Sequence, residues 1–463
     1  MQSSSSAMAS KQSLVLFMVV LSAFATPIML SATNVALPTI SRYFSLDAVT
    51  VTWIPMAYLM ASAMFVIIFG RCADLFGRKK VFIIGIGAVI LTSVFTAVSA
   101  SISMLLIGRF LQGVSAAMLY ATQMSMVTSV YPPKNRGKAI GLVVTAVYFG
   151  LAAGPLLGGL ILDSFGWRMA LLTHIPLTLV ALILGTFFVK GEWKGEKGSF
   201  DFSGSILYFL LLGCLCLAAA NIPSLFGGVL ALGFLFCLFL FFSHSLQSSS
   251  PIIDVRLFYS NVMFSRSCCT SLIMYTATYA NVFLVSLYLQ ELKGLSATNA
   301  GLIMSVQPLT MAIFSTSFGG MSDKIEPRIL SSAGILFTSI ALAILSNLSS
   351  ASPLIGFVFA LILAGMGFSL FASPNTNAIM SSVDKKDYGA ASGAVATTRM
   401  LGQLTSMVIV ALLMSLVIGD QLIEESSLPL LEKLIQLSFG FAALICIPGM
   451  ILSLFRGRKN LPA

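Results

Sequence analysis

Fourteen runs of mainly apolar residues, each long enough to cross a lipid bilayer, dominate this 463-residue chain. A membrane-spanning helix needs roughly 20 such residues to cross ~30 Å of hydrocarbon, and it satisfies its backbone hydrogen bonds within its own segment. The sequence therefore predicts an all-α integral membrane protein with short connections. The runs cover about 14–37, 51–70, 81–99, 102–123, 138–161, 168–189, 204–221, 226–245, 263–289, 298–318, 329–347, 354–376, 389–418 and 430–454.

The composition excludes a water-soluble globule. Hydrophobic residues make up 57% of the chain and charged residues only 9%, which leaves too few polar side chains to cover a soluble surface. The net charge of +10 raises the possibility of a nucleic-acid partner. However, the basic residues lie in short clusters between apolar runs rather than in one stripe, so they are better explained by membrane orientation than by nucleic acid.

The positions of Lys and Arg predict the topology, because these residues collect on the cytoplasmic side of a membrane. With the N-terminus inside, 20 of the 26 fall in inner loops and tails and four in outer loops, and the last two lie within runs. An even number of helices then places both termini in the cytoplasm. We expect a multi-pass protein of the cell inner (plasma) membrane. The outer four are Arg42, Arg168, Lys293 and Lys433, and the tail after the last run holds Arg456, Arg458 and Lys459.

Two segments of the first half recur about 250 residues later, which indicates a repeat. Gly70 and Asp74 after the second run recur as Gly319 and Asp323 after the tenth. The string Gly-x-Ala-x-Gly at 137–141 recurs at 389–393. The predicted organisation is a six-helix bundle over 1–190, a loop with two inserted helices over 191–250, and a second six-helix bundle over 251–463. Two such repeats form carriers that bind their substrate near the bilayer midplane.

The loop after the second run carries a specific motif. Gly70-Arg-Cys-Ala-Asp74-Leu-Phe-Gly77-Arg78-Lys79-Lys80 resembles the signature loop of the major facilitator superfamily. In that family the loop latches the two halves in one state, which assigns Gly70, Asp74, Gly77, Arg78 and Lys79 to a latch. The physical reading is that glycines permit the turn, Asp74 suits a helix N-terminus and the basic residues stay in the cytosol. The alternative is a solvated basic turn with no further role.

The fifth run contains a glycine string that resembles the antiporter motif of the same superfamily. Gly150, Gly154 and Gly158 lie on one helical face, where missing side chains allow close backbone approach, and Pro155 permits a bend. Gly159 completes the string. Ordinary packing of small residues is the alternative, although it explains the spacing and not the whole string.

The fourth run carries Leu106-x-x-Arg109-x-x-Gln112-Gly113, which resembles the family pattern with a membrane-embedded arginine. A charge within the hydrocarbon is costly unless it is satisfied, so Arg109 must have partners. The resemblance implies a role for Arg109 and Gln112 in proton coupling or in fixing the first helix. A purely structural arginine bonded to backbone carbonyls is the alternative.

The end of the first run, Asn34-Val-Ala-Leu-Pro38-Thr-Ile, resembles the motif of the fourteen-helix drug:proton antiporter branch. Further agreements extend along nearly the whole chain. They include Trp53, Tyr58, Trp167-Arg168, Tyr288-Leu-Gln290 and Arg399 with Gly402. The resemblance implies the major facilitator fold, with two six-helix repeats plus two inserted helices, and multidrug efflux by proton antiport.

Two positions depart from that branch. Met29 stands where an acidic residue is usual, and His174 stands where asparagine is usual. Proton antiport needs a group that binds H⁺ in one state and releases it in another. The available acids lie at helix ends or in loops, so His174 is the titratable candidate in the first half, and a hydrogen-bonded structural role is the alternative.

The substrate path is the least determined part of the prediction. Arg109 and Arg399 both lie within runs, and together they favour neutral or anionic compounds over cations. Methionines spaced four apart on the second run form a pliable wall, or else face lipid. The candidate residues of the path are Met29, Asn34, Met56, Tyr58, Met60, Gln123, Tyr275, Tyr279, Gln307, Asn375 and Arg399.

The expected activity is secondary active export of small amphipathic compounds with alternating access, powered by inward proton flow. The expected partners are the substrate, protons and membrane lipid, and the expected functional form is a monomer. No cofactor or metal is expected, since there are only two histidines and no P-loop. The alternatives are a dedicated exporter of one metabolite such as an organic acid or chelator, a receptor without transport, and a membrane enzyme. The enzyme is disfavoured because neither HExxH nor GxSxG occurs.

Overall fold

The computed structural model describes residues 2–195, 200–248, 251–321, 325–383, 388–419, 421–423 and 425–457. Within these ranges, fourteen helices are long and apolar enough to cross a membrane. The predicted all-α fold and the predicted number of spans are therefore confirmed. Asp323, Arg458 and Lys459 lie outside the described residues, so the second copy of the loop repeat is described only at Gly319.

The helices form two compact units. The first unit comprises 1–40, 57–199 and 296–305. Its helices are α1 (Gln2–Phe44), α2 (Ala48–Phe76), α3 (Arg78–Ala97), α4 (Ile102–Val130), α5 (Pro133–Phe165), α6 (Trp167–Ala170), α7 (Ile175–Ile183), the π-helix η1 (Leu184–Phe188) and α13 (Ala297–Met304). The last turn of α1 and the first two turns of α2 belong to the other unit.

The second unit comprises 41–56, 200–295 and 306–463. It contains α8 (Phe202–Asn221), α9 (Leu225–Gln247), α10 (Arg256–Ser260), α11 (Val262–Thr278), α12 (Asn281–Leu287), the π-helix η2 (Tyr288–Leu292), α14 (Val306–Met321), α15 (Pro327–Leu345), α16 (Leu354–Ser381), α17 (Tyr388–Val417), the 3₁₀ turn η4 (Glu425–Ser427) and α18 (Leu428–Leu454).

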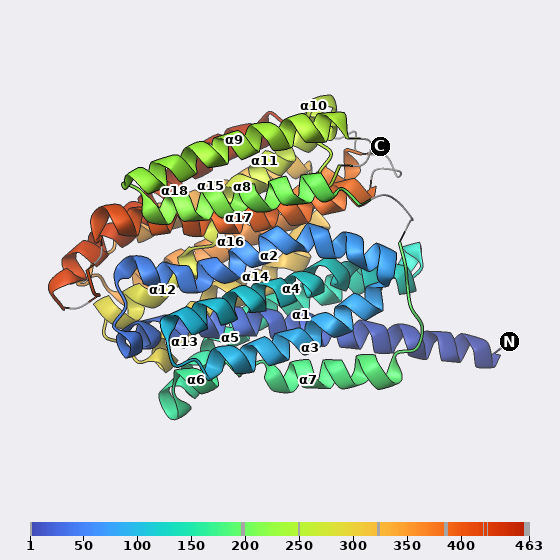
Figure 1. Cartoon of the computed structure of the whole chain (residues 1–463), viewed down its shortest axis with the longest axis horizontal. Coiled ribbons are helices and arrows are strands. Elements are labelled where there is room, and N and C mark those ends of the chain that lie inside the picture. The colour runs from blue at the N-terminus through green and yellow to red at the C-terminus, as the bar shows by residue number, and fades with distance from the viewer. Residues whose placement is uncertain are drawn as a thin grey trace. The chain divides into compact units, whose positions relative to one another are not determined.

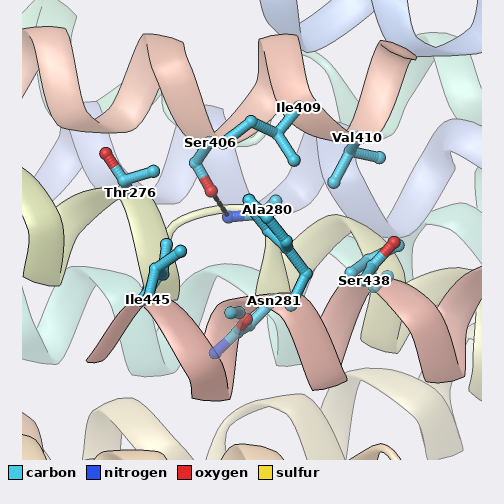
Figure 2. Close-up of a pocket in the computed structure, with 12 residues that line it drawn as sticks. Thr276, Ala280, Asn281, Ser406, Ile409, Val410, Ser438 and Ile445 are labelled. Carbon is cyan, nitrogen blue, oxygen red and sulfur yellow. Dashed lines mark hydrogen bonds between the residues drawn. The ribbon is translucent and has the colours of Figure 1, made fainter. Parts of the chain in front are cut away.

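Three runs that the sequence predicts as single helices, 168–189, 263–289 and 298–318, are each interrupted. Two of the interruptions have a proline beside them. Pro176 stands in the first turn of α7, and proline disfavours the helical conformation of the residue before it. Pro308 lacks the amide that would bond to the carbonyl of Met304, where α13 ends. In the third, the amide of Ala280 donates to Ser406 Oγ at 3.0 Å instead of to its own helix (Figure 2).

The inserted helices α8 and α9 lie side by side in Figure 1, and α8 packs against α17. In the most apolar 18-residue stretch of α9 only 11% is buried, whereas 72% of the corresponding stretch of α2 is buried. Its exposed side chains are large and apolar, including Leu225 and Phe239 at 87% and 70% exposure. This is the face that hydrocarbon would cover, so α9 is a peripheral helix of its unit.

Asp201 joins the start of α8 to the end of α9. It caps α8 by accepting from the Gly204 amide at 2.9 Å, and its carboxylate pairs with His244 Nε2 at 2.7 Å. The amide of Ile252 donates to the same carboxylate at 3.2 Å. Burial raises the pKa of Asp201, but the hydrogen bonds from Gly204, His244 and Ile252 outweigh it and leave the pKa below its ordinary value.

We expect Asp201→Ala to lower the free energy of unfolding by about 1 kcal/mol through loss of the helix cap. Since the folded pKa is depressed, the carboxylate stabilises the wild type at neutral pH, and this contribution is lost as the pH falls below about 4. Thermal unfolding of purified protein across pH measures both effects. Asp254→Asn is the matched control, because the pair of Asp254 with Arg256 is more exposed. Equal loss in both variants would contradict the assignment.

Candidate functional site

A buried polar network lies in the first unit where α3, α4 and the start of α7 meet. Arg109 Nη1 donates to Gln112 Oε1 at 2.7 Å, and Gln112 Nε2 donates to Ser93 Oγ at 2.8 Å. Ser93 Oγ lies 3.0 Å from His174 Nε2. All four side chains are at most 1% exposed. The structure thus brings together the three residues that the sequence analysis assigned to coupling or anchoring.

Ser93 is the member of this network that sequence reasoning missed. Its hydroxyl also lies 2.6 Å from the carbonyl oxygen of Val89. When His174 Nε2 carries a proton it donates to Ser93 Oγ, and the serine hydrogen points to Val89. When Nε2 carries no proton, the Ser93 hydroxyl can donate to it instead. The Nδ1 atom of His174 is buried without a hydrogen-bond partner among the described residues. The network can therefore respond to one proton by reorienting one hydroxyl.

Each unit holds an arginine over a tyrosine ring within its spans. In the first unit the guanidinium carbon of Arg109 lies 4.8 Å from the ring centroid of Tyr58, whose hydroxyl is 2.9 Å from that of Tyr120. In the second unit the corresponding distance from Arg399 to Tyr275 is 5.7 Å. The negative face of the ring attracts the guanidinium and so partly stabilises a positive charge that hydrocarbon disfavours.

One face of α5 lies against α1 in the first unit. A Cβ atom added at Gly150 would come within 3.0 Å of the backbone of Phe24, and one added at Gly158 within 3.0 Å of the backbone of Ala32. Gly154 faces the same helix. The missing side chains are therefore what allows the two backbones to approach so closely.

The other side of the same glycine string faces α13. A Cβ atom at Gly159 would overlap the carbonyl of Ala297, and one at Gly301 would overlap the carbonyl of Pro155. Hydrogen bonds join the two helices at both ends of this contact. Asp163 accepts from the amide and hydroxyl of Thr298 at 2.8 and 2.6 Å, and Ser305 Oγ donates to the carbonyl of Ala152 at 2.6 Å.

The loop at 70–80 is held within the first unit. Gly77 has a φ of +123°, which favours glycine, and it precedes α3. Arg78 pairs with Asp74 at 2.8 Å and donates to Ser129 Oγ at 2.6 Å. Gly70 lies on α2 against α4. The latch motif therefore forms a tight turn that joins three helices of one unit.

The segment after η1 returns to this loop. Both oxygens of Glu192 accept backbone amides of the first turn of α3, from Lys79 at 2.8 Å and from Lys80 at 3.1 Å. The Lys79 ammonium donates to the carbonyl of Val189. A carboxylate at a helix N-terminus is favoured by the exposed amides and the helix dipole. The sequence analysis expected Asp74 at a helix N-terminus, but Asp74 pairs with Arg78. Glu192, which takes that position on α3, was not singled out from the sequence.

Most of the predicted path residues are buried side chains. Met29, Asn34, Met56 and Tyr58 are at most 5% exposed, and Met60 and Gln307 are half-buried. Gln123 on α4 donates to Ser22 Oγ on α1 at 3.0 Å. Tyr279 is the first residue of the break between α11 and α12.

Asn375 binds a residue that lies just after the last span. Arg456 lies in the basic tail that follows α18, yet its side chain is 1% exposed and donates to Asn375 Oδ1 at 2.6 Å and to Ser331 Oγ at 3.1 Å. Burial and the neighbouring Arg328 lower the pKa of Arg456 to about 10. The long side chain folds back into the bundle because α16 offers an amide acceptor at the depth that Arg456 reaches.

A helical bundle with charged groups held inside its spans is typical of secondary carriers. The chain belongs to the Major Facilitator Superfamily, whose family profile matches residues 19–258 and 267–462. It is a multi-pass membrane transporter of small molecules and not an enzyme.

The chain is similar in sequence to two curated relatives and similar in fold to one solved structure. The chain is 29% identical to the riboflavin transporter RibZ of Clostridioides difficile, over 96% of this chain and 98% of that protein. It is also 29% identical to the multidrug resistance protein Stp of Mycobacterium tuberculosis, over 80% of this chain and 70% of that protein. A POT family transporter in complex with a thioalcohol-conjugated peptide shares the fold, with a TM-score of 0.73, 13% identity and coverage of 95% and 94%.

We expect Gly158→Ala to lower the free energy of unfolding by about 1–3 kcal/mol, because its methyl group has to displace the backbone of α1. Gly159→Ala tests the contact with α13 in the same way. Gly141→Ala is the matched control, since it lies on the same helix with open space around it. Thermal unfolding in detergent compares the variants. A Gly158 variant as stable as the Gly141 variant would refute the close contact.

Proposed function

We propose that this transporter exports small amphipathic compounds across the cell inner membrane in exchange for protons, by alternating access. The observation that carries the proposal is the buried chain of contacts from Arg109 through Gln112 and Ser93 to His174. It joins a permanent charge to a titratable ring inside the membrane span. The tight contacts of the glycine string on α5 and the name of the relative Stp add support for efflux by exchange.

The coupling follows from electrostatics. A proton on His174 places a second positive charge in the network that already contains Arg109, and in a medium of low dielectric constant these charges repel strongly. Protonation therefore favours any state in which the network opens or gains a counter-charge, and deprotonation favours the closed arrangement. This provides the exchange step that Met29, in place of the usual acid, does not supply.

Arg109 and Arg399 also favour substrates without positive charge. Each lies within a span, where solvent screening is weak. We therefore propose neutral or anionic amphipathic compounds as the substrate class, with both chain termini in the cytoplasm as the Lys and Arg distribution indicates.

A second candidate is a dedicated carrier of one heteroaromatic metabolite. It is favoured by the match to a riboflavin transporter, which spans nearly the full length of both chains, whereas the match to Stp spans 70% of that protein. The two candidates differ in breadth of substrate and not in the coupling network.

The direct test uses inverted vesicles that contain the protein and a trapped pH dye, energised and then given cationic, neutral and anionic compounds, with riboflavin among them. We expect proton release on addition of neutral and anionic amphipathic compounds. A response to ethidium but not to anionic dyes would contradict the substrate class. A response to riboflavin alone supports the second candidate. Silence from protein shown to be folded would contradict proton exchange.

The coupling network makes a separate prediction. His174→Asn keeps hydrogen-bonding capacity, but the asparagine side chain cannot take up a proton. We therefore expect substrate binding to persist while the pH dependence of transport flattens. Ser93→Ala should have the same effect by disconnecting the ring from Gln112. His244→Asn is the control, since this histidine belongs to the inserted pair. A wild-type pH profile in His174→Asn would exclude His174 from coupling.

A further inference from the structure

The helix α3 begins with residues that do not stabilise a helix start. Its first turn consists of Arg78, Lys79, Lys80 and Val81 and contains no acidic residue. The preceding residue, Gly77, makes no side-chain hydrogen bond that could cap the helix. The N-terminus of a helix carries free amides and a partial positive charge, so three cations are unfavourable there. The acceptors for these amides have to come from another part of the chain.

The acceptors come from the segment 189–195, which we call the strap. The first amide of α3, that of Arg78, donates to the carbonyl of Trp193 at 2.8 Å. The next two amides donate one to each carboxylate oxygen of Glu192, at 2.8 and 3.1 Å. The strap therefore accepts the three amides that have no acceptor within α3, and Glu192 brings the negative charge that this helix start lacks.

Two glycines show how closely the strap fits the latch motif. A Cβ atom added at Gly77 would overlap the side chain of Glu192, and one added at Gly195 would overlap the carboxylate of Asp74. The amide of Gly195 also donates to the carbonyl of Asp74 at 3.0 Å. The strap thus bonds to the backbone of both Asp74 and Arg78, the two partners of the ion pair in the latch motif.

The contacts of the strap lie at the surface, where water can replace them. Glu192 and Lys194 are exposed, and Trp193 and Gly195 are half-buried. A hydrogen bond in such a place contributes modestly to stability, because water can bond to either partner after they separate. Surface segments of this kind open locally far more often than a buried core does. The strap is therefore suited to hold the turn in one state and to release it in another.

We propose that the strap holds the latch motif in its tight turn and that Glu192 is the positioning residue of the strap. When Glu192 leaves, the first turn of α3 loses its anionic acceptor and frays. Arg78 lies in that turn, so its 2.8 Å pair with Asp74 loosens at the same time. The inference rests on the proposed function, since a latch has a role only in a carrier that alternates between states.

Hydrogen–deuterium exchange with mass spectrometry, on the full chain in phosphatidylcholine nanodiscs, tests the contact without any substrate. In Glu192→Ala we expect the amides of residues 78–80 to exchange about fivefold to tenfold faster, the usual effect of losing a helix cap. Glu192→Gln keeps an oxygen acceptor without the charge, so it should lie between this variant and the wild type. Gly195→Ala pushes the strap away from Asp74 and should also speed exchange. Lys194→Gln is the matched control, because it removes a charge from the exposed side of the strap.

The start of α8, which Asp201 caps, is the internal reference and should exchange equally in all these variants. Unchanged exchange at residues 78–80 in both Glu192→Ala and Gly195→Ala would overturn the proposal.

Transport in inverted vesicles separates a latch from a merely structural contact. A weaker latch lowers the barrier for leaving the latched state. In Glu192→Ala we therefore expect the maximum rate of proton release per folded molecule to rise about twofold or more, with an unchanged KM. Faster exchange with an unchanged or lower rate would restrict Glu192 to stability and overturn the latch role. Silence of the wild type with every compound would overturn the proposed function, while the exchange data would still decide whether the strap is bound.

Discussion

Close contact between helix backbones organises the first unit. Inside hydrocarbon, apolar side chains gain little from leaving lipid for another helix, so association depends on dispersion contacts and hydrogen bonds. The helix α5 has glycines on two sides, and it meets α1 with Gly150 and Gly158 and α13 with Gly159. In the same unit α3 packs against both α4 and α7. These contacts fix the positions of the polar residues around Arg109.

The network also shows how the chain accommodates charge where water is absent. Arg109 has a glutamine acceptor one turn along its own helix and a tyrosine ring from α2. The second unit also contains a buried arginine, Arg456. Its hydrogen-bond acceptors are the side-chain amide of Asn375 and the hydroxyl of Ser331. In both places neutral side-chain oxygens accept hydrogen bonds from the guanidinium group.

The sequence predicts the number of spans and most of their boundaries, since hydrophobic length is a direct physical requirement of the bilayer. It also brings Arg109, Gln112 and His174 forward as a group, through the family resemblance. It does not predict Ser93 or Glu192, because a serine in an apolar run and a glutamate in a loop have no distinguishing local pattern. The break at Ala280 depends on Ser406, which lies 126 residues further along. Long-range hydrogen bonds of this kind are invisible to any periodicity.

The division of the chain between the two units has a mechanical consequence. The chain changes unit five times, after residues 40, 56, 199, 295 and 305. Residues 40 and 56 lie inside continuous helices, and residue 305 separates α13 from α14. A helix resists stretching far more than a loop does, so the crossings at residues 40 and 56 are stiff connections, whereas the crossing at residue 305 lies at a break between two helices.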